Sequence, residues 1–226
     1  MRNVNETNWC PGQKMPRRKA INLIGLSALS FWIPFSCTSQ KSKLSSFELQ
    51  FLHYKTLAEV AEWIRTKKIT SEELTQIMLD RIAAIDNRLH SYITVMGKDA
   101  LTDAKALDKE LAEGKYRGPL HGVPVGVKDL LYTTNAPTTG GHLFKANFIP
   151  SYNATVVERL HNAGAVILGK LNLTEGATGG YNSTTPIPKN PWGEDLWTGL
   201  SSSGSGVATA AGLCFGSIGT DTGGSI

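Results

Sequence analysis

The sequence predicts an α/β fold, in which helices cover a mixed β-sheet. From residue 57 onward, stretches with apolar residues at helical spacing alternate with short runs rich in valine, isoleucine and leucine. This alternation is typical of α/β proteins. The 226 residues, of which 41% are hydrophobic and 19% charged, have the composition of an ordinary folded protein. A chain of this length can bury one good core or two small ones.

Three helices are predicted in the first half of the fold. Apolar residues at helical spacing mark residues 57–64 and 74–85, and the segment from Thr70 to Glu73 offers a capping box for the second helix. A short strand is expected at residues 92–95. A highly charged helix then runs from residue 99 to about residue 112, and Gly114 ends it.

A strand predicted at residues 123–127 leads directly to a lysine. Val123, Val125 and Val127 alternate as in a strand, and Lys128 stands at its C-terminal end, where α/β proteins place their reactive groups. One interpretation is an ion-paired lysine, with Asp129 as the obvious partner. The other is a base, whose pKa burial lowers until the amine is neutral.

The middle of the chain continues the alternation. The pattern predicts a loop at residues 135–141, a helix at 154–163, a buried strand at 165–168 and the start of another helix at 172–175. Residues 181–197 contain three prolines and two tryptophans and are expected to be irregular.

Glycines and hydroxyls crowd together at residues 199–206 and again at 219–225. The first run alone reads as a flexible linker. A small-residue helix expected at 207–211 and a buried strand expected at 213–218 instead predict a packed unit that brings both turns together. Consecutive N–H groups in such turns bind anions, and a serine beside them is placed for nucleophilic attack. An aspartic protease would need a second Asp-Thr-Gly besides that of Asp221, and no P-loop sequence is present.

The first 37 residues are interpreted as an export signal. Arg17 and Arg18 precede an apolar run at residues 20–35, which is short for a membrane span and resembles a twin-arginine signal. Cys37 resembles a bacterial lipoprotein cleavage site, which predicts a lipid anchor there. We therefore expect a periplasmic or membrane-anchored protein, with a cytoplasmic location as the alternative, and a linker at residues 38–54.

Charge, histidine and cysteine usage argue against several classes of function. Five of the 23 Lys and Arg residues and one of the 19 Asp and Glu residues lie in the first 37 positions. The rest of the chain is therefore neutral and gives no support to nucleic-acid binding. Cys214 stands alone in the expected fold, which disfavours structural disulfides. The five histidines are scattered, so no metal site is expected.

From about residue 50 to the end, the chain closely resembles the amidase signature family. The resemblance rests on ordered motifs, which are Leu-His-Gly-Val-Pro-Val-Gly-Val-Lys-Asp at 120–129, Pro-Thr-Thr at 137–139, Ala-Thr-Val-Val-Glu-Arg-Leu at 154–160, Gly-Ala-Val-Ile-Leu-Gly-Lys at 164–170, Asn-Pro-Trp at 190–192, Ser-Ser-Ser-Gly-Ser at 201–205 and Gly-Thr-Asp-Thr-Gly-Gly-Ser at 219–225. Family members continue far beyond the last motif, so residues 55–226 are expected to be the N-terminal half of an amidase domain.

The resemblance implies a catalytic triad that needs no cofactor or metal. Ser225 is then the nucleophile and Lys128 is the base. Ser201 lies 24 positions before Ser225 and is the bridging serine in a cis peptide. The implied reaction hydrolyses a small-molecule or peptide amide to an acid and ammonia or an amine, through an acyl-enzyme. Two alternatives stay open, the amidase component of a tRNA-dependent amidotransferase and a non-catalytic member. The implied oxyanion donors are the backbone N–H groups of Thr222, Gly223, Gly224 and Ser225.

Overall fold

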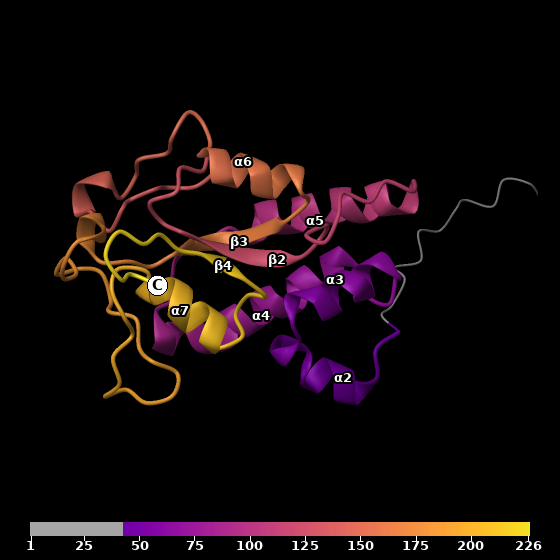
Figure 1. Cartoon of the computed structure of the whole chain (residues 1–226), viewed down its shortest axis with the longest axis horizontal. Helices are drawn as coiled ribbons and strands as arrows, with labels where there is room; N and C mark the ends of the chain where they lie inside the picture. The colour runs from indigo at the N-terminus through magenta and orange to yellow at the C-terminus, as the bar shows by residue number, and fades with distance from the viewer. Residues whose placement is uncertain (1–42) are drawn as a thin grey trace, which may run out of the picture. The chain divides into compact units, whose positions relative to one another are not determined.

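A computed structural model describes residues 43–226. The predicted export signal at residues 1–37, with Arg17, Arg18 and Cys37, lies outside the described residues. The described part is built on a four-stranded sheet with the order β1-β3-β2-β4 (Figure 1). Strand β1 (Tyr92–Val95) runs antiparallel to β3 (Val166–Leu171), whereas β2 (Pro124–Lys128) runs parallel to both β3 and β4 (Ser217–Ile218). The predicted α/β fold with a mixed sheet is therefore confirmed.

Helices pack on both faces of this sheet. Successive residues of a strand point to opposite faces, and β3 follows this rule. Val166 and Leu168 belong to one hydrophobic core with residues of α3 (Leu57–Arg65), α4 (Ser71–Leu89), α5 (Gly97–Ala112) and α7 (Ser203–Ala210). Ile167 belongs to a second core with α6 (Thr155–Asn162). Figure 1 shows α6 and α7 on opposite sides of the sheet.

The folded region begins before residue 55, the start expected from the sequence. Within the expected linker, the structure has a short helix, α2 (Ser46–Gln50), and a 3₁₀ turn, η1 (Leu52–Tyr54). Leu52 is fully buried in the larger core. Two further 3₁₀ turns are η2 (Leu143–Lys145) and η3 (Glu175–Ala177). Across residues 43–226, no helix is both long enough and apolar enough to span a membrane.

Two predicted elements differ from the structure. The expected strand at 213–218 is reduced to β4, because Leu213 completes the end of α7. Gly212 has a φ of 65°, and the N–H groups of Gly212 and Leu213 donate to carbonyls in the last turn of α7, as in a Schellman motif. The expected helix start at 172–175 is a loop followed by η3. The Asn172 side chain does not cap a helix there, because its amide donates to the backbone carbonyls of His90 and Pro186.

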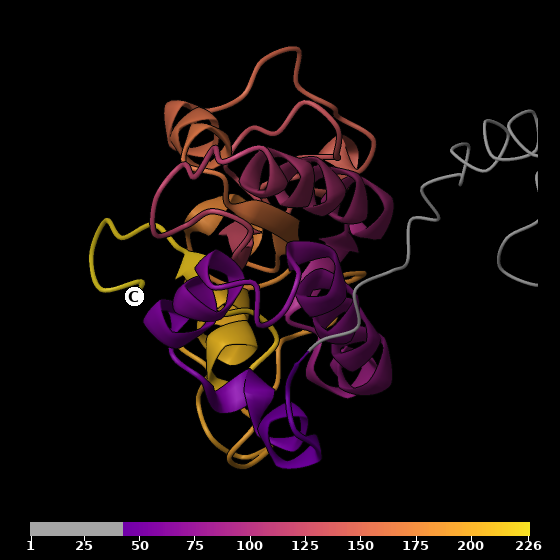
Figure 2. The ribbon, with the colours of Figure 1, turned by 90° about the vertical axis from the view of Figure 1, so that its right-hand side faces the viewer.

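The sheet brings two distant segments to one edge. Because β2 and β4 are parallel neighbours, with Val127 opposite Ile218, their C-terminal ends lie side by side. Lys128 ends β2, and residues 219–226 follow β4. The C-terminal segment lies beside α7 in Figure 1, and Figure 2 shows it as a loop that leaves the end of β4. This edge is where the sequence predicts the reactive groups.

Candidate active site

Lys128 is a fully buried lysine surrounded by oxygen atoms. Its side chain is 0% exposed, and burial lowers the pKa of its amine from the usual 10.5 to about 8, although the charge of Asp221 acts in the opposite direction. The Lys128 Nζ lies 2.6 Å from the Ser201 Oγ and 2.9 Å from the Ser202 Oγ. It also lies 2.9 Å from the Thr220 Oγ1 and 3.4 Å from the Thr220 carbonyl oxygen. A fraction of such a lysine is neutral near pH 7 and can act as a base.

Asp129 is not the ion partner of Lys128, contrary to the first interpretation of the sequence. Its Oδ1 lies 3.6 Å from the Nζ of a second buried lysine, Lys170, and its Oδ2 accepts hydrogen bonds from the backbone N–H and the hydroxyl of Thr139. Adjacent residues at a strand end point to opposite faces of the sheet. Lys128 and Asp129 therefore belong to separate polar clusters.

The Lys170 cluster holds the loop that follows β2. The Lys170 ammonium donates to the Leu131 carbonyl and to the hydroxyls of Thr133 and Thr138. Burial lowers the pKa of the Lys170 amine, and the charge of Asp129 opposes this effect. The Lys170 ammonium and the Asp129 carboxylate thus form a buried ion pair, in which each charge has a partner of opposite sign, as a buried charge requires.

A close backbone contact fixes the start of α7 beside Lys128. A Cβ added to Gly204 would lie 2.5 Å from the backbone N and O of Asn172 and 2.6 Å from the Ser91 carbonyl oxygen. The Gly204 N–H donates to the Asn172 carbonyl at 3.0 Å. Only glycine permits this approach of two backbones, and the approach places Ser201 and Ser202 over the end of β2.

The three predicted catalytic residues form a continuous chain of contacts. The Leu200–Ser201 peptide bond is cis, and Ser201 is buried. The Ser201 Oγ lies 2.6 Å from the Lys128 Nζ and 3.4 Å from the Ser225 Oγ. With a protonated lysine, Lys128 donates to Ser201 and Ser201 donates to Ser225. With a neutral lysine, both hydroxyls can rotate and donate in the opposite direction.

The turn that carries Ser225 gathers backbone donors around a carboxylate. The N–H groups of Gly224 and Ile226 donate to the two Asp221 oxygens at 2.6 and 3.2 Å. Hydrogen bonds from the backbone of residues 223–226, with that of Ser225 the strongest, lower the pKa of Asp221. This turn therefore binds an anion with its N–H groups, and three of the expected oxyanion donors, those of Gly223, Gly224 and Ser225, face Asp221 in this structure.

His121, the histidine inside a motif, is occupied elsewhere. Its Nδ1 accepts a hydrogen bond from the Arg117 N–H at 3.2 Å, and its Nε2 faces the Leu107 carbonyl at 3.0 Å. Both ring nitrogens are used within the core, so His121 is not placed to activate Ser225. Residues 43–226 contain no group of three or more histidine, cysteine, aspartate or glutamate side chains that could hold a metal ion.

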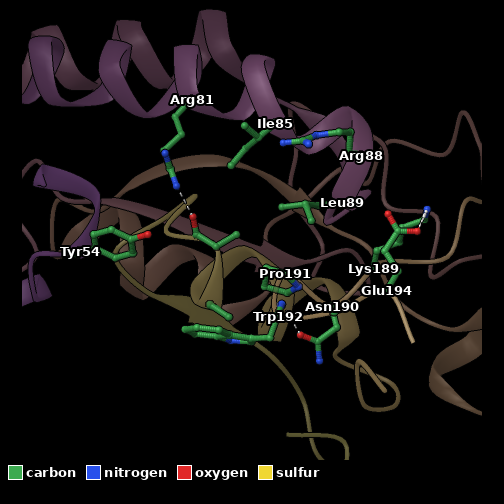
Figure 3. Close-up of a pocket in the computed structure, with 13 residues that line it drawn as sticks. Tyr54, Arg81, Ile85, Arg88, Leu89, Lys189, Asn190, Pro191, Trp192 and Glu194 are labelled. Carbon is green, nitrogen blue, oxygen red and sulfur yellow. Dashed lines mark hydrogen bonds and ion pairs between the residues drawn. The ribbon is translucent and has the colours of Figure 1, made fainter. Parts of the chain in front are cut away.

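A cavity of about 750 Å³ borders the serine chain. Ser202 and Ser225 line it together with the apolar side chains of Trp197, Leu200 and Ile226. A separate groove of about 440 Å³ lies between α4, residues 189–194 and the end of α7 (Figure 3). None of Lys128, Ser201 and Ser225 lines that groove, so the larger cavity is the one that can bring a ligand to Ser225.

Comparison with known proteins identifies the family. The family described as "Amidase" matches residues 73–226, a segment that contains Lys128, Ser201 and Ser225. The chain belongs to the amidase family. This membership confirms the resemblance that the motifs of the sequence indicate.

Relatives of this chain in the amidase family are much longer than it is. The putative amidase AmiD of Mycobacterium tuberculosis is 58% identical over 170 residues, which are 75% of this chain and 36% of AmiD. The A component of the glutamyl-tRNA(Gln) amidotransferase of Moorella thermoacetica is 44% identical over 77% of this chain and 36% of its own length. The crystal structure of the native peptide amidase from Stenotrophomonas maltophilia has a TM-score of 0.69 and 36% identity, over 74% of this chain and 36% of that one. The chain thus spans about a third of each of these three relatives.

Proposed function

We propose that this chain carries the catalytic triad of an amidase, which hydrolyses a carboxylic amide through an acyl-enzyme on Ser225. The observation that carries the proposal is the contact chain from the buried Lys128 Nζ through the Ser201 Oγ to the Ser225 Oγ, at 2.6 and 3.4 Å. The second distance is longer than a strong hydrogen bond, and catalytic contacts in ligand-free enzymes often tighten only when substrate binds.

The reaction starts with the neutral form of Lys128. The Lys128 amine takes the proton of Ser201 while Ser201 takes that of Ser225, and the Ser225 Oγ attacks the amide carbon. The tetrahedral intermediate collapses when Lys128 returns the proton through Ser201 to the leaving nitrogen, which departs as ammonia or an amine. A water molecule activated by the same route then hydrolyses the ester, releases the acid and restores Ser225.

Backbone N–H groups of the turn would stabilise the oxyanion in this mechanism. The donors are those of Thr222, Gly223, Gly224 and Ser225. The last three already face a carboxylate, that of Asp221, which supports the affinity of this turn for negative charge. An oxyanion that uses the Gly224 N–H has to take the place of Asp221 at that donor.

The amidase component of an amidotransferase remains the second candidate, because the Moorella protein of that kind is 44% identical to this chain. We favour the hydrolase because the identity to a putative amidase is higher, at 58%. We also propose that the protein is exported, on the basis of Arg17, Arg18 and the apolar run that follows them. A lipid anchor at Cys37 would then hold it at the membrane.

The reaction is tested by incubating the 226-residue chain with an amidated dipeptide, an aliphatic acyl amide and glutamine. We expect ammonia release and a transient acyl adduct in the mass spectrum, both of which Ser225→Ala abolishes. The matched control is Ser183→Ala, since Ser183 is exposed and does not belong to the contact chain. Ammonia release that Ser225→Ala leaves unchanged, or no release from any of the three amides, would contradict the proposal. Release from glutamine alone would favour the amidotransferase.

A further inference from the structure

Lys128 has two hydroxyl partners besides the bridging serine. The Ser202 Oγ and the Thr220 Oγ1 each lie 2.9 Å from the Lys128 Nζ, slightly farther than the Ser201 Oγ at 2.6 Å. The three hydroxyls come from the start of α7 and from the turn after β4, so they surround the nitrogen from two different segments. Neither Ser202 nor Thr220 has a role in the triad described above.

The other contacts of Ser202 fix the direction of its hydrogen bond to Lys128. The Ser202 hydroxyl donates to the Thr220 carbonyl oxygen at 2.9 Å, and its oxygen also accepts from the Thr220 N–H at 3.2 Å. A hydroxyl has one hydrogen to donate. Because that hydrogen is committed to Thr220, the Ser202 oxygen can only accept a hydrogen bond from Lys128.

Counting hydrogens on a neutral lysine leads to a specific orientation. A neutral amine has two N–H donors and one lone pair. One N–H is directed to the Ser202 oxygen, and the other is within reach of the Thr220 Oγ1. With both donors used, the lone pair is left facing the Ser201 Oγ, which is where a base must point to receive the proton of Ser201.

We propose that Ser202 and Thr220 are positioning residues, which bind the two hydrogens of the neutral Lys128 amine and so direct its lone pair at Ser201. This inference rests on the proposed function, because it assigns an orientation to the base of that mechanism. Without these acceptors, the amine can rotate about its terminal bond and present a hydrogen to Ser201 instead of the lone pair. Such a rotamer cannot accept the proton, so the fraction of productive molecules falls.

The same contacts affect the protonation of Lys128. Acceptors that bind the ammonium raise its pKa, so Ser202 and Thr220 oppose the effect of burial. The charge of Asp221, in the turn after β4, also raises the pKa of Lys128, as the hydroxyls do. The Lys170 ammonium, on the adjacent strand, instead pairs with Asp129 and donates to the Thr133 hydroxyl. The residues just before α7 contribute the neutral hydroxyls of Ser201 and Ser202. Loss of one acceptor should therefore lower the pKa of Lys128.

The test compares Ser202→Ala and Thr220→Val with two matched variants. Ser205→Ala, in the helix that follows Ser202, is the control, because Ser205 is as buried as Ser202, at 5% exposure, and its hydroxyl has no hydrogen-bond partner. Thr220→Ser keeps the hydroxyl and should restore wild-type behaviour. Circular dichroism checks that each variant is folded.

Two measurements are made on the full 226-residue chain. NMR titration of a ¹⁵N- and ¹³C-labelled lysine side chain gives the pKa of Lys128. The rate at which a fluorophosphonate probe labels Ser225, as a function of pH, gives the activity of the nucleophile. For Ser202→Ala and Thr220→Val, we expect the pKa to fall by roughly half a unit to one unit. We also expect the labelling rate on the high-pH plateau, where lysine is neutral, to fall roughly ten- to a hundredfold.

The two measurements separate this inference from the proposed function. If the pKa of Lys128 and the plateau rate in Ser202→Ala equal those of Ser205→Ala, the positioning role is wrong. If Thr220→Ser shows the same pKa and plateau rate as Thr220→Val, the Thr220 hydroxyl does not position the Lys128 amine, and this result also overturns the inference. If the wild-type chain shows no labelling of Ser225, the proposed function fails, and the NMR titration still decides whether the two residues hold the amine.

Discussion

Replacement of Lys128 by methionine tests the role of the buried base. Methionine fills most of the lysine volume and carries no titratable group, so Lys128→Met removes the base without leaving a large cavity. The pKa of about 8 at Lys128 means that about one tenth of the molecules hold a neutral lysine at pH 7, and about nine tenths at pH 9. Labelling of Ser225 by a fluorophosphonate probe should therefore rise roughly tenfold between pH 7 and pH 9 and then level off.

The magnitude expected for Lys128→Met follows from its place in the contact chain. Members of a nucleophile–base unit act together, and loss of one typically lowers the rate by roughly 10³- to 10⁶-fold. The assay follows probe labelling by fluorescence after gel electrophoresis, at several times and at each pH, with an excess of probe. Because the probe reacts directly with the nucleophile, its labelling rate reports on Ser225 and its base. A labelling rate within tenfold of wild type, or a wild-type profile that is flat from pH 7 to pH 9, would refute the reasoning.

Three further predictions concern other residues. Asp129→Asn leaves the buried Lys170 ammonium without its counter-ion, so the free energy of unfolding in urea should fall by about 3–5 kcal/mol. The control Glu194→Gln, in an exposed ion pair, should not change that free energy measurably. Equal effects of the two variants would contradict the role of Asp129. His121→Ala should lower the melting temperature but leave probe labelling within a few-fold of wild type, because both ring nitrogens bond inside the core; loss of labelling in a folded variant would show that His121 is the base. Replacing Arg17 and Arg18 by lysine should retain the protein in the cytoplasm on cell fractionation, and an unchanged periplasmic or membrane location would reject a twin-arginine route.

Periodic patterns predicted most of the fold, and the exceptions have local causes. The helices α3, α4 and α6 and the strand β2 follow from apolar spacing, because each has one side packed on a core. The helix α5 was predicted from its charged residues and from the glycine that ends it. The strand expected at 213–218 is shortened to β4, because Leu213 and Cys214 are buried through the end of α7 and not through the sheet. Apolar runs of this length occur in both settings, so spacing alone could not separate them.

The candidate site was predicted in part from the order of motifs. The resemblance assigned Lys128, Ser201 and Ser225, and the structure places their side chains in one chain of contacts. The partner of Asp129 was missed, because Lys170 is 41 positions away and only strand pairing brings the two together. Ser202 was missed as well, since its role depends on where its single hydrogen is donated, which the sequence does not encode.

The central claim is that Ser225 is the nucleophile and that its reactivity depends on the contact chain to Lys128. The most direct measurement is tandem mass spectrometry of the 226-residue chain after reaction with a fluorophosphonate probe, which locates the adduct on a single residue. We expect one adduct, on Ser225, in the wild-type chain and in the Ser205→Ala control, and none in Ser225→Ala or Lys128→Met. An adduct on Ser201 or Ser202, or an adduct on Ser225 that forms equally fast in Lys128→Met, would contradict it.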